Sequence, residues 1–329
     1  MNLLVVTNNP DRASFRQRIG IYPDILRTKG IDCEVAKLPS GSLARRKLFK
    51  QAAEFNGVFL HKKGLNLLDA FWLRKYSRKI IYDFDDAVMY NPITPDRDSL
   101  SHFIPFRRTV KLADLVIAGN SYLADHAKKF NPNVRILSTG LDTAAYRHQL
   151  PPANDGKIRL VWIGSKATLQ YLAGIRPALE EIGSRFDNVV LRIICDDFPH
   201  LRCIPLEKRP WSEDTQVIDL ATSDIGLAPL PDNRFTKGKC GFKTLQYAAA
   251  GLPVVASPVG VNAEYIQQGV NGFLADGTTD WLNKICQLIN DRKLRMQMGQ
   301  NAKILAHRFD LKVLGPKLTT LIKQCVENK

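Results

Sequence analysis

Short runs of consecutive apolar residues recur along the whole chain and alternate with longer amphipathic segments. Runs that are apolar at nearly every position are typical of strands buried on both faces, as in a parallel sheet covered by helices. They lie at residues 2–7, 32–38, 57–62, 79–84, 115–119, 134–138, 158–164, 189–195, 224–230, 252–257 and 272–275. The pattern predicts an α/β fold built on parallel sheets.

One segment near the middle of the chain interrupts this alternation. Residues 148–157, HQLPPANDGK, contain two prolines together with Asn, Asp and Gly, which is typical of a linker. A chain of 329 residues suffices for two domains of about 150 residues each. We therefore expect two doubly wound, Rossmann-like domains, residues 1–150 and 157–308, which face a cleft and bind ligands at the carboxyl ends of their strands.

The formal net charge is +15, and the excess is uneven. Residues 1–150 have 24 Lys and Arg against 14 Asp and Glu, whereas residues 151–329 have 23 against 18. The basic first half favours an anionic partner, which is a nucleic acid, an anionic membrane surface or a phosphorylated substrate. A basic surface that only keeps the protein soluble explains the charge equally well.

The cysteines and the amino terminus exclude several other classes. The chain has six cysteines, none of them in a Cys-x-x-Cys pair or beside a cluster of histidines. Neither a zinc site nor a disulfide framework is therefore expected. The apolar run at 3–6 lacks the basic start of a secretion signal, and no run approaches the roughly 18 residues of a membrane-spanning helix. These features favour a cytoplasmic location.

Residues 236–257, TKGKCGFKTLQYAAAGLPVVAS, concentrate positive charge where a loop becomes a helix. The apolar spacing that starts at Phe242 predicts a helix that begins between Gly241 and Thr244. The free backbone N–H groups and the dipole of a helix amino terminus form an anion site.

Two lysines and two glycines flank this expected helix start. Lys239 and Lys243 would add full positive charges, and Gly238 and Gly241 would let an anion approach the backbone closely. A diphosphate fits such a site. The alternative is a basic turn that is merely solvated.

A second glycine turn follows the first apolar run of the second half. Gly164, Ser165 and Thr168 could present N–H or hydroxyl groups at a helix start. The alternative is an ordinary strand–helix turn capped by Ser or Thr.

Residues 223–275 resemble the donor-binding half of the group 1, family 4 glycosyltransferases, which have the GT-B fold. That family has a segment E-A-M-A-x-G-x-P-V-V-A-S, then a G-G-x-x-E turn and an N-G-x-L strand. Here QYAAAGLPVVAS (246–257), GVNAE (260–264) and NGFL (271–274) stand at these places. The resemblance covers nearly the whole chain and is strongest from 158 to 306.

The resemblance implies that residues 157–308 bind a nucleotide-diphosphate sugar and that residues 1–150 lie on the acceptor side. It also implies that a last helix, 309–329, crosses back to the first domain, that the reaction retains the anomeric configuration, and that neither a metal nor another cofactor takes part. The residues expected to bind the donor at the glycine turn and around the helix start are Gly164, Ser165, Gly241, Phe242, Thr244, Gln246 and Glu264.

Several positions depart from the family. Gln246 replaces the glutamate that holds the ribose, and it can still hydrogen-bond hydroxyl groups without a charge. Gly238 stands where the family has a second glutamate. Ser165 and Gln170 occupy the places of an Arg and a Lys, so we infer that Lys239 and Lys243 neutralise the diphosphate instead. Because the ribose-binding glutamate is absent, a catalytically inactive relative of these enzymes is a further alternative.

The segment 205–213, PLEKRPWSE, resembles the loop that lies near the nucleotide base. Lys208, Arg209 and Trp211 are the candidates to line the base. For Trp211, simple packing in the core is an equally good interpretation.

In the first half, IYDFDDAVMY (81–90) places Asp83, Asp85 and Asp86 at a strand end. An Asp-x-Asp metal motif belongs to the other glycosyltransferase fold, so no metal site is expected here. We expect Asp85 to position an acceptor hydroxyl and another of these aspartates to cap the next helix. His61, also at a strand end, is a candidate for the acceptor side, although a lone histidine is usually structural.

Two segments of the first half, 42–55 and 103–112, mix large apolar residues with Lys and Arg. Such segments can rest on anionic lipid, which would place the protein at the inner face of the cytoplasmic membrane. A solvated helix face is the alternative.

These features together favour a hexosyltransferase that moves a sugar from a nucleotide-diphosphate donor to a glycan or lipid-linked acceptor in cell-envelope polysaccharide or lipopolysaccharide synthesis. One alternative is a nucleotide-sugar epimerase of the same fold. Another is a non-catalytic nucleic-acid-binding protein, but no helix-turn-helix, RRM or KH pattern occurs, so no nucleic-acid partner is expected.

Overall fold

The computed structural model describes residues 1–147 and 155–327, and these residues form two compact units. Unit 1 consists of Met1–Leu141, Asn233–Cys240 and Leu311–Lys329, and unit 2 consists of Asp142–Asp232 and Gly241–Asp310. Most of the predicted linker, residues 148–154, lies outside the described residues.

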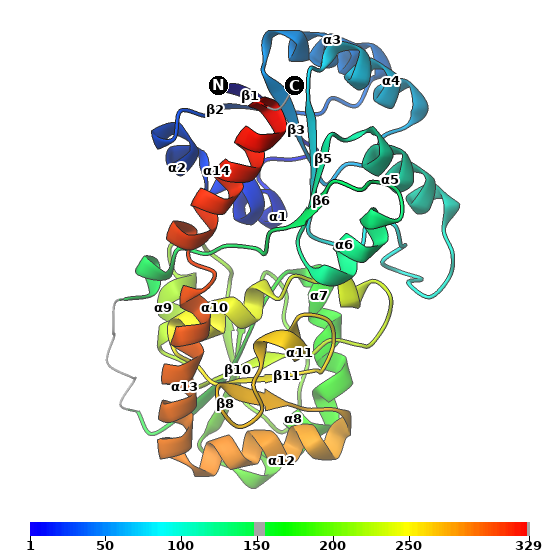
Figure 1. Ribbon diagram of the computed structural model, residues 1–329. Coiled ribbons are helices and arrows are strands. Elements are labelled where there is room, and N and C mark those ends of the chain that lie inside the picture. Colours follow the sequence, from blue (N-terminus) through cyan, green and yellow to red (C-terminus); the bar gives the residue numbers. More distant parts are fainter. Residues whose placement is uncertain (148–154, 328–329) are drawn as a thin grey trace. The chain divides into compact units, whose positions relative to one another are not determined.

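Unit 1 is built on one parallel sheet of six strands (Figure 1). Its strands are β1 (Asn2–Thr7), β2 (Asp32–Lys37), β3 (Gly57–His61), β4 (Ile80–Phe84), β5 (Leu115–Ala118) and β6 (Val134–Ile136). The spatial order is β2-β1-β3-β4-β5-β6, so the direction of winding reverses between β1 and β3. Side chains at the carboxyl ends of these two strands flank the point where such sheets bind ligands.

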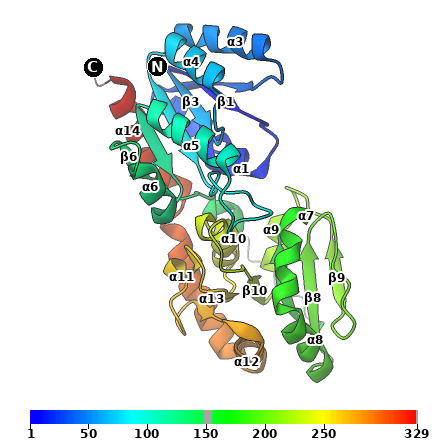
Figure 2. The same ribbon diagram turned by 90° about the vertical axis from the view of Figure 1, so that its right-hand side faces the viewer.

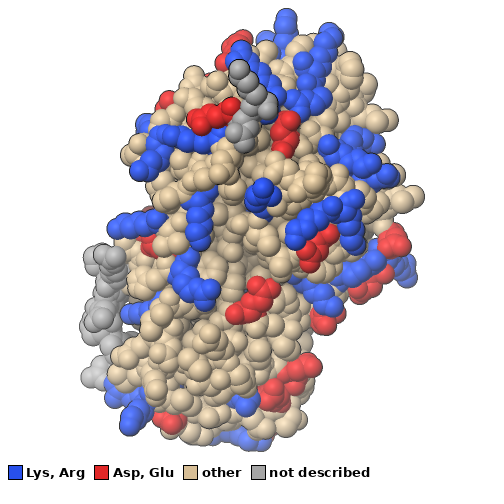
Figure 3. Space-filling model, in the orientation of Figure 1, with Lys and Arg blue, Asp and Glu red and all other residues tan. Residues whose placement is uncertain are grey.

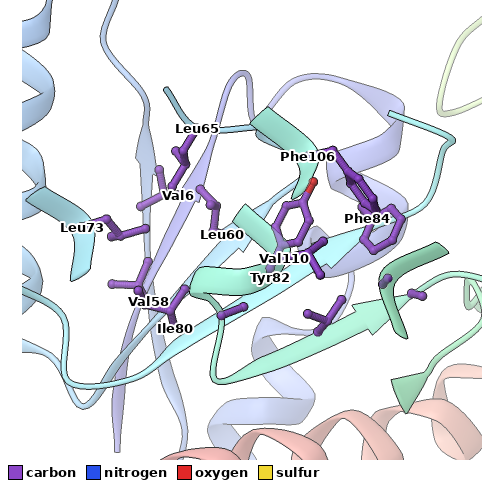
Figure 4. Packing of buried hydrophobic residues seen from close by; sticks show 14 of the residues in the cluster. Val6, Val58, Leu60, Leu65, Leu73, Ile80, Tyr82, Phe84, Phe106 and Val110 are labelled. Carbon is purple, nitrogen blue, oxygen red and sulfur yellow. The ribbon is translucent and has the colours of Figure 1, made fainter. Parts of the chain in front are cut away.

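Helices cover both faces of this sheet. They are α1 (Ala13–Phe15), the π-helix η1 (Arg16–Gly20), α2 (Pro23–Thr28), α3 (Ser42–Gln51), η2 (Ala52–Glu54), α4 (Leu67–Tyr76), α5 (Leu100–Leu112), α6 (Ser121–Lys128), η5 (Thr236–Gly238) and α14 (Leu311–Glu327). One core joins the strands to α3–α6, and Figure 4 shows part of it, with Phe84 and Phe106 in edge contact. The last helix, α14, packs against α2 (Figure 1).

Unit 2 is a second parallel sheet of six strands. Its strands are β7 (Ile158–Ile163), β8 (Val189–Ile194), β9 (Leu206–Arg209), β10 (Ile225–Ala228), β11 (Val254–Ala256) and β12 (Gly272–Leu274). The order β12-β11-β10-β7-β8-β9 is that of a dinucleotide-binding fold, and winding reverses between β7 and β10.

The helices of unit 2 also lie on both faces of its sheet. They are η3 (Thr143–Arg147), α7 (Lys166–Leu169), η4 (Gln170–Ile175), α8 (Arg176–Arg185), α9 (Gln216–Ala221), α10 (Phe242–Ala250), α11 (Asn262–Tyr265), α12 (Gly277–Asn290) and α13 (Arg292–His307). Helix α8 packs against β8 and α12 (Figure 2), whereas α10 packs against α13 and also contacts β10 and β11. The predicted class, two Rossmann-like α/β domains, is confirmed.

One local prediction is wrong, and two helical regions are divided. Residues 206–209, expected in a loop, form the edge strand β9, because pairing with β8 overrides the low strand tendency of Glu, Lys and Arg. Residues 16–30 contain two helices: the π-helix η1 ends at Gly20, and α2 starts at Pro23, where proline suits a first turn. Near the carboxyl terminus, α12 and α13 are divided at Asp291, which caps α13.

Tyr247 of α10 connects this helix to two strands inside unit 2. Its hydroxyl accepts a hydrogen bond from the Ile163 N–H (3.0 Å) and donates one to the Leu227 carbonyl (3.1 Å), and the side chain is fully buried. The two bonds tie α10 to β7 and β10.

We expect Tyr247→Phe to lower the free energy of unfolding of unit 2 by about 1–3 kcal/mol, because the Ile163 N–H loses a buried partner. Urea denaturation monitored by tryptophan fluorescence measures this loss. Tyr171→Phe, at a half-buried position, is the control. Equal midpoints for the two variants would contradict the prediction.

Candidate functional site

The amino terminus of α10 is shaped by Gly241. This residue has φ of +65°, a left-handed conformation that glycine adopts without strain, and it directly precedes the first helical residue, Phe242. A Cβ at Gly241 would also lie 2.8 Å from Val261 and from the Tyr265 ring. The expected position of the helix start, between Gly241 and Thr244, is therefore confirmed.

Lys243, in the first turn of α10, has its ammonium held by an aromatic ring and a hydroxyl. Its Nζ lies 3.8 Å from the centroid of the Trp162 ring and 3.3 Å from Thr168 Oγ1. A Cβ at Gly164 would meet both this ammonium and the Trp162 ring, so only glycine leaves room for them. The structure therefore brings Gly164 and Lys243 together, where the winding of the sheet reverses.

Gln246 lies one turn further along α10 and belongs to a polar network. Its Nε2 donates to Gln216 Oε1 (3.2 Å) and to the Tyr146 hydroxyl (3.4 Å). Trp211 Nε1 also donates to Gln216 Oε1 (3.4 Å). Burial raises the pKa of Tyr146 to about 12, so its hydroxyl stays protonated at neutral pH. Both N–H groups of Gln246 Nε2 donate to these two partners, so the Oε1 atom is the part of this amide that can accept a hydrogen bond from a ligand.

The other predicted donor-binding residues of unit 2 differ in exposure. Thr244 is buried and donates to Asn262 Oδ1 (2.9 Å), which joins α10 to α11. Ser165 precedes α7 and is exposed, and Glu264 is exposed on α11. Phe242 is half-buried.

The two basic residues assigned to the base lie on the edge strand β9. Lys208 Nζ lies 5.6 Å from the centroid of the Phe198 ring, and Arg209 approaches Asp219 at 3.5 Å. Both residues are exposed, and Trp211 follows on the next loop.

Lys239 belongs to unit 1, within a network of two lysines and two aspartates. Its Nζ lies 2.9 Å from Asp86, and Lys62 contacts both Asp86 and Asp85, the latter at 3.0 Å. Burial alone would raise the pKa of Asp86, but Lys62 and Lys239 outweigh it and hold that pKa well below its usual range. Asp86 therefore stays ionised, and the structure places Lys239 and Lys243 in different units.

The segment that carries Lys239 is fastened to unit 1 by further bonds. Asn120 Nδ2 donates to the carbonyls of Gly238 (3.1 Å) and Lys239 (3.2 Å). A Cβ at Gly238 would lie 2.9 Å from the Ala87 backbone nitrogen, so this glycine permits a close approach between chain segments.

His61 ends β3, beside Asp83 of β4. Its Nδ1 lies 3.2 Å from Thr7 Oγ1, whereas its buried Nε2 has no hydrogen-bond partner within the described residues. Burial lowers the pKa of His61, which keeps the ring neutral at pH 7. Asp83 is neutralised by two bonds from the buried Arg18.

No helix starts directly after the three aspartates, since α5 begins only at Leu100, so the prediction that one of them caps a helix is wrong. Each carboxylate of this group contacts a cation from unit 1 instead. Within residues 1–147 and 155–327, no group of three or more His, Cys, Asp or Glu side chains could hold a metal ion.

Sequence reasoning missed the side chains that position the predicted ones. Trp162 was assigned to a buried strand and Tyr146 and Gln216 were not singled out, because contacts between segments far apart in the chain leave no pattern in spacing. The pairing of Arg18 with Asp83, 65 positions apart, is of the same kind.

Comparison with known proteins bears on the second half of the chain. Residues 224–305 match the sequence model of a family described as glycosyl transferases group 1. The D-inositol 3-phosphate glycosyltransferase of Corynebacterium glutamicum (strain R) is 29% identical over 126 residues, 38% of this chain and 28% of that protein. The match thus spans less than a third of the length of this relative.

Solved structures resemble the chain over almost its whole length. Anabaena Alr3699/HepE in complex with UDP-glucose has a TM-score of 0.71 at 17% identity, over 98% of this chain and 100% of that one. WaaG, a glycosyltransferase involved in lipopolysaccharide biosynthesis, has a TM-score of 0.68 at 15% identity, over 97% and 99%.

The fold therefore defines an α/β protein of the GT-B class, with two Rossmann-like domains. Within that class, residues 224–305 are similar to the group 1 glycosyltransferases, and the resemblance drawn from the sequence is confirmed there.

The lowered pKa of His61 makes folding sensitive to acid. When the pKa of a histidine is lower in the folded than in the unfolded protein, the folded protein loses stability as pH falls through the unfolded pKa, here near 6.5. We expect the free energy of unfolding to decrease below that pH, and His61→Asn to remove part of the slope. Urea denaturation at a series of pH values tests this. The exposed His200→Asn is the control, and parallel slopes for both variants would argue against a buried neutral imidazole.

Proposed function

We propose that this protein is a glycosyltransferase that transfers a sugar from a nucleotide-diphosphate donor held by unit 2. The observation that carries the proposal is the position of the Lys243 ammonium, in the first turn of α10 and beside the Gly164 turn. The α10 amino terminus offers free N–H groups and the positive end of a dipole, and Lys243 adds a full charge to it. A diphosphate is the donor group that matches this arrangement.

The Trp162 ring gives Lys243 a defined place. A cation over an indole face is attracted by the electrons of the ring and keeps its positive charge, so that it can also attract an anionic ligand. As the donor's diphosphate departs, the anomeric carbon gains oxocarbenium character and negative charge grows on the phosphate oxygens. Groups already directed at that charge lower the barrier.

Lys239 has a different part in this proposal from the one inferred from sequence. Because its ammonium lies on Asp86, its charge is already balanced within unit 1. We propose that Lys243 is the principal lysine for the diphosphate, while Lys239 acts mainly through the charge network of unit 1.

Unit 1 supplies the acceptor side of the proposed reaction. The neutral His61, with Nε2 available as donor or acceptor, can hold an acceptor hydroxyl, and Asp85, which follows β4 and acts electrostatically on His61, is the carboxylate proposed to position it. The engagement of Asp83, Asp85 and Asp86 by Arg18, Lys62 and Lys239 supports a reaction without a metal. Retention of configuration is proposed from the family resemblance.

The acceptor we propose is a glycan or a lipid-linked saccharide of the cell envelope, with the protein acting at the cytoplasmic face of the membrane. The basic excess of residues 1–150 supports an acceptor that carries phosphate. The name of the Corynebacterium relative includes a phosphorylated compound, D-inositol 3-phosphate, and WaaG is described as involved in lipopolysaccharide biosynthesis. Within the described residues no helix has the length and apolar character needed to cross a bilayer.

Removal of the Lys243 ammonium tests the proposal. We expect Lys243→Ala to lower kcat/KM about 100- to 1,000-fold, the effect of losing one charge-stabilising group, while the circular dichroism spectrum is unchanged. Initial rates of sugar release from UDP-glucose and related donors, with and without saccharide acceptors, provide the measurement.

The exposed Lys293→Ala is the control for loss of a lysine in unit 2. Activity near that of the unmodified protein in Lys243→Ala would refute the assignment. Formation of an isomeric nucleotide sugar without any acceptor would instead indicate an epimerase.

Gln246 gives a second test, at the ribose. Its Oε1 is the expected acceptor for a ribose hydroxyl, so Gln246→Ala should weaken UDP binding about five- to tenfold by loss of one hydrogen bond. The same substitution should not alter the binding of 2′,3′-dideoxy-UDP, which has no such hydroxyls. Isothermal titration calorimetry measures both. An equal loss for the two nucleotides would remove Gln246 from the ribose.

A further inference from the structure

Helix α4 exposes three large apolar side chains on one side. The exposed fractions are 71% for Leu67, 57% for Leu68 and 60% for Phe71. Positions i, i+1 and i+4 of a helix share one face, so the three side chains form a patch. The opposite side of α4 is ordinary core, with Leu73 fully buried.

Lysine follows this patch along the helix. Lys75 Nζ lies 5.9 Å from the centroid of the Phe71 ring and 5.8 Å from that of Tyr76. Long lysine stems that run over apolar groups while the ammonium stays in water are typical of surfaces between an apolar and an aqueous phase.

Helix α3 packs against α4 (Figures 1 and 2). It also exposes an apolar side chain beside lysines. Leu43 is 79% exposed, and Lys47 and Lys50, four and seven positions later, are exposed on the same face. Phe49, an apolar residue of the mixed segment 42–55, is fully buried in the core of unit 1. The exposed apolar residues thus come mainly from α4, which the sequence analysis did not select.

The charge around the two helices is strongly positive. Residues 42–78 contain nine Lys and Arg but only two acidic residues, Glu54 and Asp69, and Asp69 is buried on Arg45 at 2.8 Å. In Figure 3 Lys and Arg side chains gather at the end of unit 1 that carries α3 and α4. The surface therefore matches a negatively charged partner.

We propose that the exposed faces of α3 and α4 dock on a lipid bilayer with anionic headgroups. Leu67, Leu68 and Phe71 enter the boundary between headgroups and acyl chains, and the lysines contact lipid phosphates. The docking concerns unit 1 alone and extends the proposed function by naming where a lipid-linked acceptor would be met. It can be tested, and can fail, independently of sugar transfer.

A bilayer suits this surface better than a second copy of the chain. An isologous dimer would bring the same lysines of both copies together, and like charges repel. A layer of anionic headgroups compensates many cations at once, and its boundary accepts Leu and Phe side chains without a shaped partner surface.

Flotation of the full chain with vesicles tests the docking. The vesicles are phosphatidylcholine alone or phosphatidylcholine with about one-third phosphatidylglycerol. We expect binding to the anionic vesicles only, and a marked loss of it at about 0.5 M NaCl, where charges are screened over a few ångströms.

Two sets of variants separate the apolar from the charged contribution. Leu67→Gln/Leu68→Gln/Phe71→Gln should abolish flotation, and Lys47→Gln/Lys50→Gln should weaken binding roughly 25-fold, about fivefold for each lysine. The matched controls lie in unit 2, at exposed positions: Met296→Gln/Ile304→Gln and Lys157→Gln/Lys293→Gln, which should bind as the unmodified protein does.

Four results would overturn the proposal. They are no flotation with anionic vesicles, equal binding to both kinds of vesicle, equal losses in the control variants, and a dimer in light scattering that the α4 substitutions convert to a monomer. Rates of donor hydrolysis or transfer to a soluble acceptor should be the same in both α3 and α4 variants, so a failure of docking is distinguishable from a failure of the proposed reaction.

Discussion

Parallel strands that are buried on both faces leave only their ends for polar chemistry. In both units the strands are covered by helices, and strands such as β3, β4 and β10 have no exposed residue. Most candidate functional groups therefore lie at a carboxyl end or on the helix that follows it. Gly164 follows β7, His61 ends β3, and the three aspartates end β4.

Charged side chains at the sheet edges of the two units lie against different kinds of group. In unit 2 the ammonium of Lys243 lies over the Trp162 ring and beside Thr168 Oγ1. In unit 1 the ionisable groups at the sheet edge are paired: Arg18 with Asp83, Lys62 with Asp85 and Asp86, and Lys239 with Asp86. A buried charge is tolerated only when it is paired, so these pairs let several carboxylates share one small region.

The segment Asn233–Cys240 shows why neighbours in sequence need not share a role. It leaves unit 2 after β10, is bound within unit 1 by Asn120 and Asp86, and returns at Gly241 to start α10. Lys239 and Lys243, four positions apart, thus have different surroundings. The left-handed conformation of Gly241 lets the chain change direction between them.

The sequence by itself determined most of the strands, the two Rossmann-like domains, the start of α10 and the family resemblance, because apolar periodicity, glycine and proline act over a few residues. It also selected Gly164, Lys243 and Gln246 as residues of one region. Only the tertiary structure decided that Trp162 supports Lys243, that Gln216 and Tyr146 orient Gln246, and that Asp86 compensates Lys239. It also decided that residues 206–209 form an edge strand and that α4 exposes its leucines. These outcomes depend on contacts between distant segments, and the burial of one side chain by another has no counterpart in local spacing.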